Sequence, residues 1–415
     1  MLRSRGTLIL ALCAGSASSA RAQITEILSN REVADALEAI RTSNEWTLSQ
    51  QTELCRIPAP PFQEAARAAE LRRRFQALGL QRVRIDDEGN VIAERPGSGT
   101  GPRVALTAHL DTVFPDTVEI TITQDGPRLA GPGIGDDCRG LAVILRVARA
   151  LQESRIRTAG SVLFVGTVGE EGQGNLRGVR HLFDRRSAGR IDYFISVDGA
   201  GSSATSRAVG SHRYRARYRG PGGHSYGDFG VPNPIHALGR AMAAIADFRV
   251  PIEPRTTFNV GVIAGGTSVN SIAMSAAMEV DFRSERQETL DAVDAMFRRA
   301  LEDALAAEHA RWPHGARLTL ELEEIGRRPA ADQPDTAFIV RTTVAAARAI
   351  GFTPALSASS TDANYPKSLG IPAITLDGGG RGQGAHSLLE WYDDGPDGWR
   401  GPQWALLLVL GLAGR

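Results

Sequence analysis

Histidine and carboxylate side chains directly follow several apolar segments of this sequence, and these residue types ligate divalent metal ions. His109 and Asp111 come after the apolar run 104–108, in AHLDT. A histidine at this position is a candidate zinc ligand, and an aspartate two residues later could orient the imidazole by accepting its other ring N–H. Taken alone, the HxD pattern favours a structural histidine over a metal ligand.

Two pairs of adjacent carboxylates come next in the sequence. Asp136 and Asp137 lie in GIGDDCRG, and Glu170 and Glu171 lie in TVGEEG, directly after the apolar run 161–167. Adjacent carboxylates repel each other unless a cation neutralises them, which a metal ion does. In the second pair one carboxylate can bind metal while its neighbour acts as a general base. The alternatives are an aspartate pair that caps a helix and an exposed acidic turn.

The last two candidates also follow apolar runs. Asp198, in SVDGAG, ends the run 191–197, and His386, in GAHSLLEW, lies beyond the run 371–376. The carboxyl ends of parallel strands share one edge of a sheet, where α/β folds bind their ligands. We therefore expect a two-metal site with two imidazoles and three carboxylates, one of them bridging. Its candidate ligands are His109, Asp198, His386 and one member of each carboxylate pair.

These residues need a sheet to bring them together, and the apolar runs alternate with helical patterns as an α/β fold requires. Helical periodicity covers 31–55, 63–79, 140–152 and 336–350. The alternation predicts a catalytic domain with a mostly parallel central sheet that is covered by helices. The apolar run 404–412 is too short to span a membrane, so we expect a packed helix there.

The pattern changes between 209 and 325, which predicts a smaller inserted domain. Its expected elements are a strand at 212–219, a helix at 234–247, strands at 256–264 and 274–284, a helix at 286–308 and a strand at 317–324. This β-α-β-β-α-β order is typical of a ferredoxin-like α+β sandwich. The catalytic domain then consists of 23–208 and 326–415.

The N-terminus has the pattern of a secretory signal. Arg3 and Arg5 precede the apolar run 8–14, and small residues lead to Ala20-Arg21-Ala22. This pattern predicts a signal peptide at 1–22 and export to the periplasm or the cell exterior, with an N-terminal helix as the alternative. The mature chain would keep two cysteines, Cys55 and Cys138. Two cysteines do not make a disulfide framework, so the fold is expected to depend on its hydrophobic core.

The charge balance excludes some classes of partner. The 415 residues include 47 lysines and arginines and 47 aspartates and glutamates. Without a basic excess or a polybasic tract, we expect neither a nucleic-acid partner nor, once the signal is removed, a membrane partner. The glycine-rich stretch 378–384 is not followed by Lys-Ser or Lys-Thr, so a phosphate-binding loop is not indicated.

In their order along the chain, these motifs resemble the di-zinc exopeptidase family that contains glutamate carboxypeptidase, peptidase T, dipeptidases, aminoacylase and acetylornithine deacetylase. The resemblance covers nearly the whole mature chain. It implies two zinc ions per chain, with cobalt or manganese as alternatives. His109 and Asp198 would hold one ion, Glu171 and His386 the other, and Asp136 would bridge them.

The resemblance also implies roles beyond the ligands. Asp111 would orient His109, and Glu170 would be the general base that takes a proton from the water between the metals. The inserted domain would be a lid that forms a homodimer, and three of its residues would contact substrate. These are His224 in GGHS, Asn270 in GGTSVNSIA and Arg283 in VDFRS. Without the resemblance they fit a loop residue, a turn residue and a residue of a surface strand.

The sequence departs from the family pattern beside the bridging residue. Many relatives have Asp-Asp-Lys-Gly-Gly, whereas this chain has Asp-Asp-Cys-Arg-Gly at 136–140. Arg139 is a candidate for the missing positive charge, and Cys138 has no assigned role.

The expected substrate also follows from the resemblance. Aspartate at position 198 is typical of the family's aminopeptidases and dipeptidases, and the stretches 57–64 and 360–380 are similar to peptidase T. The sequence therefore favours an exopeptidase of di- and tripeptides. An N-acyl-amino-acid deacylase or carboxypeptidase is the alternative, and a binding module without catalysis is disfavoured because the complete set of candidate ligands is present.

Overall fold

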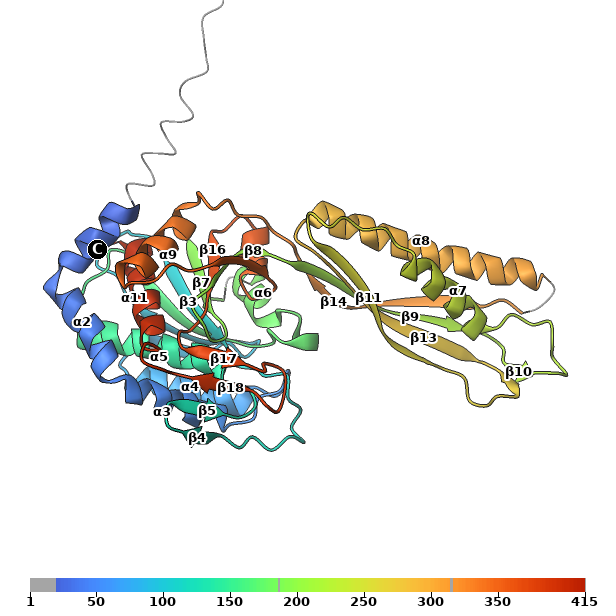
Figure 1. The fold of residues 1–415 in the computed structure, drawn as a ribbon, viewed down its shortest axis with the longest axis horizontal. Helices are drawn as coiled ribbons and strands as arrows, with labels where there is room; N and C mark the ends of the chain where they lie inside the picture. The colour runs from blue at the N-terminus through green and yellow to red at the C-terminus, as the bar shows by residue number, and fades with distance from the viewer. Residues whose placement is uncertain (1–19, 186, 314–315, 415) are drawn as a thin grey trace, which may run out of the picture. The chain divides into compact units, whose positions relative to one another are not determined.

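The computed structural model describes residues 20–185, 187–313 and 316–414. The chain divides into two compact units, which Figure 1 shows. Unit 1 joins the chain up to Ala208 with Gln333–Arg415, and unit 2 is Val209–Asp332. Unit 2 ends at Asp332 rather than at the expected residue 325. Most of the predicted signal peptide, residues 1–19, lies outside the described residues, and residues 20–22 begin a helix that runs to residue 29.

Unit 1 contains an eight-stranded sheet in the order β1-β2-β6-β3-β7-β16-β8-β15. The four apolar runs singled out in the sequence are the adjacent strands β6, β3, β7 and β16, and all of them are parallel to their neighbours in this group. Their carboxyl ends therefore lie at the same edge. The strands are β1 (Gln81–Ile85), β2 (Val91–Arg95), β3 (Val104–His109), β6 (Val162–Thr167), β7 (Tyr193–Val197), β8 (Ala204–Ala208), β15 (Leu356–Ser359) and β16 (Ala373–Leu376).

Helices cover both faces of this sheet because alternate strand residues point to opposite faces. Val104 and Leu106 belong to the larger apolar core, whereas Ala105 between them belongs to a second core. The larger core packs against α2 (Arg31–Thr42), α4 (Ala65–Ala77), α5 (Cys138–Glu153), α9 (Phe338–Ala349) and α11 (Arg400–Ala413). The second core includes residues of α6 (Arg177–Asp184). The predicted helix at 404–412 is confirmed as the packed helix α11, and no helix in the described ranges is long and apolar enough to cross a membrane.

The predicted helix at 31–55 consists of two helices, α2 and α3 (Asn44–Cys55), which meet at Ser43. Cys55, the last residue of α3, forms a disulfide with Cys138, the first residue of α5. Their Cα atoms lie 5.4 Å apart although 83 positions separate them in the sequence. This single disulfide was not predicted from the sequence; it forms because α3 packs along α5 and brings the two thiols together.

A smaller four-stranded sheet lies in the same unit, in the order β17-β18-β5-β4. Its strands are only three residues long, which explains why sequence periodicity does not reveal them. They are β4 (Thr123–Asp125), β5 (Arg128–Ala130), β17 (Arg381–Gln383) and β18 (Trp391–Asp393). This sheet joins the segment before the Asp136 loop to the segment that contains His386.

Unit 2 has an antiparallel sheet in the order β11-β13-β9-β14, with two helices packed on one face. Residues of β13 alternate between buried and half-buried, so one face of the sheet meets the helices. Its elements follow the predicted order, with an added two-stranded ribbon. They are β9 (Gly210–Arg219), β10 (Gly223–His224), α7 (Pro234–Ala246), β11 (Thr256–Gly265), β12 (Ser271–Ile272), β13 (Ser275–Ser284), α8 (Gln287–Arg311) and β14 (Thr319–Arg328).

Candidate metal centre and active site

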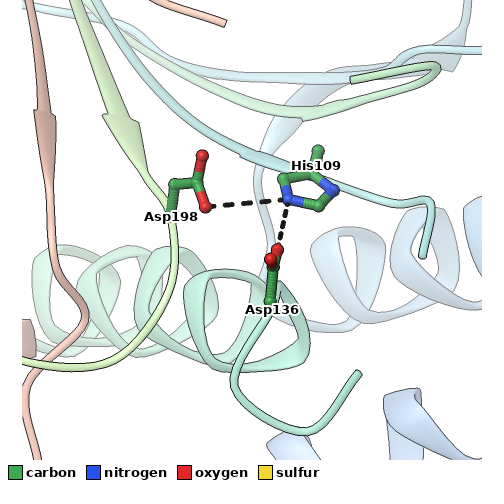
Figure 2. Close-up of side chains that lie close together, drawn as sticks. All are labelled: His109, Asp136 and Asp198. Atoms are coloured by element: carbon green, nitrogen blue, oxygen red, sulfur yellow. Dashed lines mark hydrogen bonds and ion pairs between the residues drawn. The ribbon is translucent and has the colours of Figure 1, made fainter. Parts of the chain in front are cut away.

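The first half of the site forms around His109, the last residue of β3. Its Nε2 lies 3.0 Å from Oδ1 of Asp136 and 3.8 Å from Oδ1 of Asp198. Figure 2 shows these two carboxylates converging on the same ring nitrogen from the loop before α5 and from the end of β7. The imidazole is buried, and both carboxylates are half-buried. One nitrogen and two carboxylate oxygens thus face a common point.

The second half forms around His386. Its Nε2 lies 3.3 Å from Oδ2 of Asp136 and 2.9 Å from Oε1 of Glu171. The two oxygens of Asp136 therefore face different histidines, with Oδ1 toward His109 and Oδ2 toward His386. A carboxylate that bridges two metal ions must present its oxygens in this way.

The donor set fits two divalent ions. His109, Asp136 and Asp198 offer ligand atoms within 4.8 Å of one another, and so do Asp136, Glu171 and His386. Each group combines an imidazole nitrogen with carboxylate oxygens, which suits zinc. The two groups share Asp136, so the five predicted ligands lie together as one cluster.

The pKa values of the two histidines show how strongly they interact with the neighbouring carboxylates. Burial would lower the pKa of His109, but Asp137, Asp111 and Asp136 together raise the pKa well above its usual value. Hydrogen bonds to Asp136 and Glu171 raise the pKa of His386 to about 10. The cluster of carboxylates thus attracts positive charge, which protons supply in the metal-free protein and divalent cations would supply in the loaded one.

Asp137, the neighbour of the bridging residue, has a different task. It is fully buried, and its carboxylate accepts the backbone N–H groups of His109 at 3.1 Å and of Gly140 at 2.9 Å. It is therefore the N-cap of α5, and it also ties the end of β3 to the start of that helix. The helix-capping alternative therefore applies to Asp137, whereas Asp136 stays a candidate metal ligand.

Asp111 lies beside His109, but the contact differs from the expected one. The Nδ1 atom of His109 lies 2.9 Å from the main-chain carbonyl oxygen of Asp111 and 3.7 Å from its carboxylate. The main chain of Asp111 thus orients the imidazole. Its carboxylate instead accepts the backbone N–H groups of Glu170 at 3.1 Å and Glu171 at 2.7 Å. A ligand atom of Glu170 lies within 4.8 Å of those of His109 and Glu171, so the predicted general base is at the site.

The three predicted substrate-binding residues of unit 2 do not form one group. His224 and Asn270 are neighbours at the β10–β12 ribbon, where Ser225 donates its N–H to the Asn270 carbonyl at 3.0 Å. Arg283 is near the other end of the ten-residue strand β13, where its Nε donates to Asp281 at 2.7 Å. At about 3.4 Å per residue, the length of β13 keeps Arg283 away from the ribbon.

Arg139 does not place its charge among the ligands as anticipated. Its buried guanidinium donates to the carbonyl oxygens of Gly378 at 2.8 Å and Gly398 at 2.7 Å. It also lies over the ring of Tyr392, 4.8 Å from the centroid. The side chain thus packs the start of α5 against the C-terminal segments.

Sequence reasoning missed two residues that contact the main chain near the site. Arg67 is buried on α4 and donates to the carbonyl oxygen of Leu110, between His109 and Asp111, at 2.8 Å. Glu390 is buried, and its carboxylate contacts the loop that contains Asp136. In the sequence, the only sign that Arg67 has a structural role is its charge on the apolar face of its helix. Glu390 gives no such sign beyond its place four residues after His386.

A comparison with known protein families identifies the family of this chain. The model described as peptidase family M20/M25/M40 matches residues 105–398, more than half of the chain. The chain belongs to this family. The M20/M25/M40 match spans all five predicted ligands, and members of the family are metal-dependent hydrolases that often hold two ions. The chain is accordingly a hydrolase that acts on peptide-type C–N bonds.

Individual M20/M25/M40 proteins differ in how much of the chain they match. The uncharacterized protein YqjE of Bacillus subtilis is 28% identical over 348 residues, which cover 79% of this chain and 89% of that protein. Carboxypeptidase G2 of a Pseudomonas species is also 28% identical, but over only 49% of each chain. The crystal structure of aminopeptidase PepT from Bacillus cereus has a TM-score of 0.72 at 24% identity, covering 89% of this chain and 99% of that one. This likeness confirms the fold.

Proposed function

We propose that the protein is a metal-dependent exopeptidase that hydrolyses the terminal peptide bond of di- and tripeptides. The observation that carries the proposal is the Asp136 carboxylate, whose two oxygens face His109 and His386 separately. Asp198 completes one set of donors and Glu171 the other. These residues would hold two zinc ions.

The chain's own residues supply the proton transfers. Bound zinc lowers the pKa of a water molecule and polarises the substrate carbonyl. The Glu170 carboxylate takes the proton from the attacking water and passes it to the leaving nitrogen, as a general base and then a general acid. Asp111 fixes the position of Glu170 because it accepts the backbone N–H at 3.1 Å. Burial of Glu170 keeps bulk water from competing for this proton.

The substrate class rests on two observations. By the resemblance, aspartate at position 198 is typical of the family's aminopeptidases and dipeptidases, and the fold is similar to that of aminopeptidase PepT. A relative named carboxypeptidase G2, and others named acetylornithine deacetylase, favour the alternative of a carboxypeptidase or N-acyl-amino-acid deacylase.

A substrate panel tests the proposal. Purified protein is incubated with Ala-Ala, Ala-Ala-Ala, N-acetyl-ornithine and a peptide with a C-terminal glutamate, each with and without a chelator. We expect cleavage of the two free-amine peptides, its loss with the chelator and its return with added zinc. Cleavage of only the N-acylated or C-terminal glutamate substrates would reject the dipeptidase proposal in favour of the alternative. Activity that the chelator leaves unchanged would reject the metal-dependent mechanism.

We also propose that the protein is exported by its N-terminal segment. The Cys55–Cys138 disulfide supports this proposal, since structural disulfides persist in oxidising compartments. Fractionation of the native host, followed by N-terminal sequencing, tests it. Mature protein that begins after Ala22 and is found outside the cytoplasm is the expected result, and full-length protein confined to the cytoplasm would contradict it.

A homodimer through unit 2 is our third proposal, and the edge strand β11 supports it. Val262 and Ile263 on β11 are exposed, and an exposed apolar edge strand can pair with another chain. Sedimentation velocity tests the proposal. We expect a dimer for the wild type and a monomer for Val262→Lys with Ile263→Lys, and a monomeric wild type would contradict it.

A further inference from the structure

The carboxylate of Glu390 binds the loop that leads into the bridging residue. Its Oε2 accepts the backbone N–H of Gly133 at 2.8 Å, and its Oε1 accepts those of Gly135 at 2.8 Å and Asp136 at 2.9 Å. The Glu390 main-chain carbonyl accepts a fourth N–H, from Gly131, at 2.9 Å. Glu390 is 2% exposed, so these bonds form away from water.

The loop itself is shaped for this contact. A Cβ on Gly135 would lie 3.1 Å from Oε1 of Glu390, so the missing side chain lets the carboxylate approach the backbone. Gly133 has φ of +77°, a conformation that glycine adopts without steric cost. The N–H groups of three residues are thereby turned toward one carboxylate, which offsets part of the cost of burying its charge.

The same short segment provides a ligand of the second ion. His386 lies four residues before Glu390, and its Nε2 faces Glu171 and Asp136. Residues 386–390 thus supply one ligand from a side chain and hold the backbone of another ligand. A shift of this segment would change both contacts to the second ion together.

We propose that Glu390 is a positioning residue that fixes the main chain of Asp136 and so sets the distance between the bridging carboxylate and the two histidines. This role rests on the metal-binding part of the proposed function. Glu390 acts through Asp136, because its own carboxylate oxygens are occupied by backbone donors.

Glu390→Gln tests the role with little change in volume. The amide keeps one acceptor oxygen, but its NH₂ group must then face a backbone N–H. Outer residues of this kind alter metal affinity by about 10–100-fold. We therefore expect zinc affinity, measured by competition with a chromophoric chelator, to fall by about 10–100-fold for at least one of the two ions. The visible spectrum of the cobalt-loaded variant should also change, because the geometry at the ion changes.

Two further variants make the result specific. Glu308 is a buried glutamate of unit 2 whose Oε1 also accepts a backbone N–H, from Asn233 at 3.0 Å. Glu308→Gln should leave zinc affinity within about twofold of wild type. Gly135→Ala should weaken zinc binding in the same direction as Glu390→Gln, because the added methyl displaces the carboxylate, and it provides the test if Glu390→Gln does not fold.

The outcomes separate this inference from the proposed function. If the wild type binds two zinc ions and both Glu390→Gln and Gly135→Ala bind them equally well, Glu390 has no positioning role. A wild-type protein that binds no zinc would overturn the proposed function and this role with it. Weaker zinc binding in both variants with unchanged binding in Glu308→Gln supports the role.

Discussion

The carboxylate of Asp111 accepts the backbone N–H of Glu171 at 2.7 Å, and its other oxygen accepts that of Glu170 at 3.1 Å. The aspartate after β3 therefore holds the two glutamates after β6. One of these glutamates is a candidate ligand and the other the candidate base. A single buried carboxylate thus fixes the backbone positions of both glutamates.

Replacing Asp111 with asparagine should reduce turnover without unfolding the protein. An amide has one acceptor oxygen, so one of the two N–H groups loses its partner. We expect kcat for Ala-Ala to fall by about 10–100-fold at saturating zinc. Asp87→Asn, at an exposed position, is the matched control and should retain wild-type kcat. A kcat within twofold of wild type for Asp111→Asn would show that this link is dispensable.

The adjacent glutamates should respond differently to truncation. Glu170→Ala removes the general base, so kcat should fall by about 10²–10⁴-fold while the zinc content stays near that of wild type. Glu171→Ala removes a ligand and should lower the zinc content. Elemental analysis of dialysed protein, together with initial rates, measures both effects. If Glu170→Ala kept most of its activity, the proposed proton transfers would be wrong.

The disulfide should contribute measurably to stability. It closes a long loop, with a sequence separation of 83 between Cys55 and Cys138, and such cross-links typically stabilise by about 2–5 kcal/mol. The double variant Cys55→Ser with Cys138→Ser should therefore have a lower free energy of unfolding in urea. Wild type measured in a reductant should approach the value of the double variant, whereas the variant itself should not respond to the reductant. Equal stability of variant and wild type would contradict the prediction.

Lys367 should make stability depend on pH. It is buried in α10 (Asn364–Ser368), its Nζ donates to the Thr205 carbonyl at 3.2 Å, and burial lowers its pKa from 10.5 to about 7. Between these two pKa values the unfolded chain binds the proton and the native state does not, so stability rises with pH. Below about pH 7 Lys367 is protonated in both the native and the unfolded state, so the native state bears the full cost of burying this charge.

The variant Lys367→Met removes this titration. The free energy of unfolding of this variant, relative to that of wild type, should fall by up to about 1.4 kcal/mol per pH unit between about pH 7 and pH 9. Urea unfolding at several pH values measures the difference. Ser368→Ala, a change at an exposed neighbour without a titratable group, should keep the wild-type slope. A parallel pH dependence of Lys367→Met and wild type would show that Lys367 remains charged in the native state.

The strands that carry the site could be predicted because burial on both faces makes them apolar throughout. β3 and β6 are buried at every position, and an uninterrupted apolar run of that length is typical of a central parallel strand. β1 was missed, since its sequence QRVRI is exposed or half-buried at the edge of the sheet. The break between α2 and α3 at Ser43 was also missed, because no glycine or proline marks it in the sequence.

The candidate ligands could be predicted because each follows a strand or its loop and has a side chain of the right chemistry. Contacts to the main chain could not be predicted in this way. Glu390 and Arg67 bind backbone groups, which every residue has, so their partners leave no trace in residue types. The Cys55–Cys138 pairing depends on how α3 packs along α5, and local sequence patterns do not contain that information.

The place of β16 in the sheet has a consequence for the order of assembly. This strand lies between β7 and β8, yet it follows them in the chain by the whole of unit 2 and three further elements. A growing chain that has not reached residue 373 therefore has β7 with one side unpaired, at the middle of its sheet. His386 comes later still. The second group of candidate ligands can form only after synthesis has passed His386, so a chain that stops before this residue should lack that half of the candidate site.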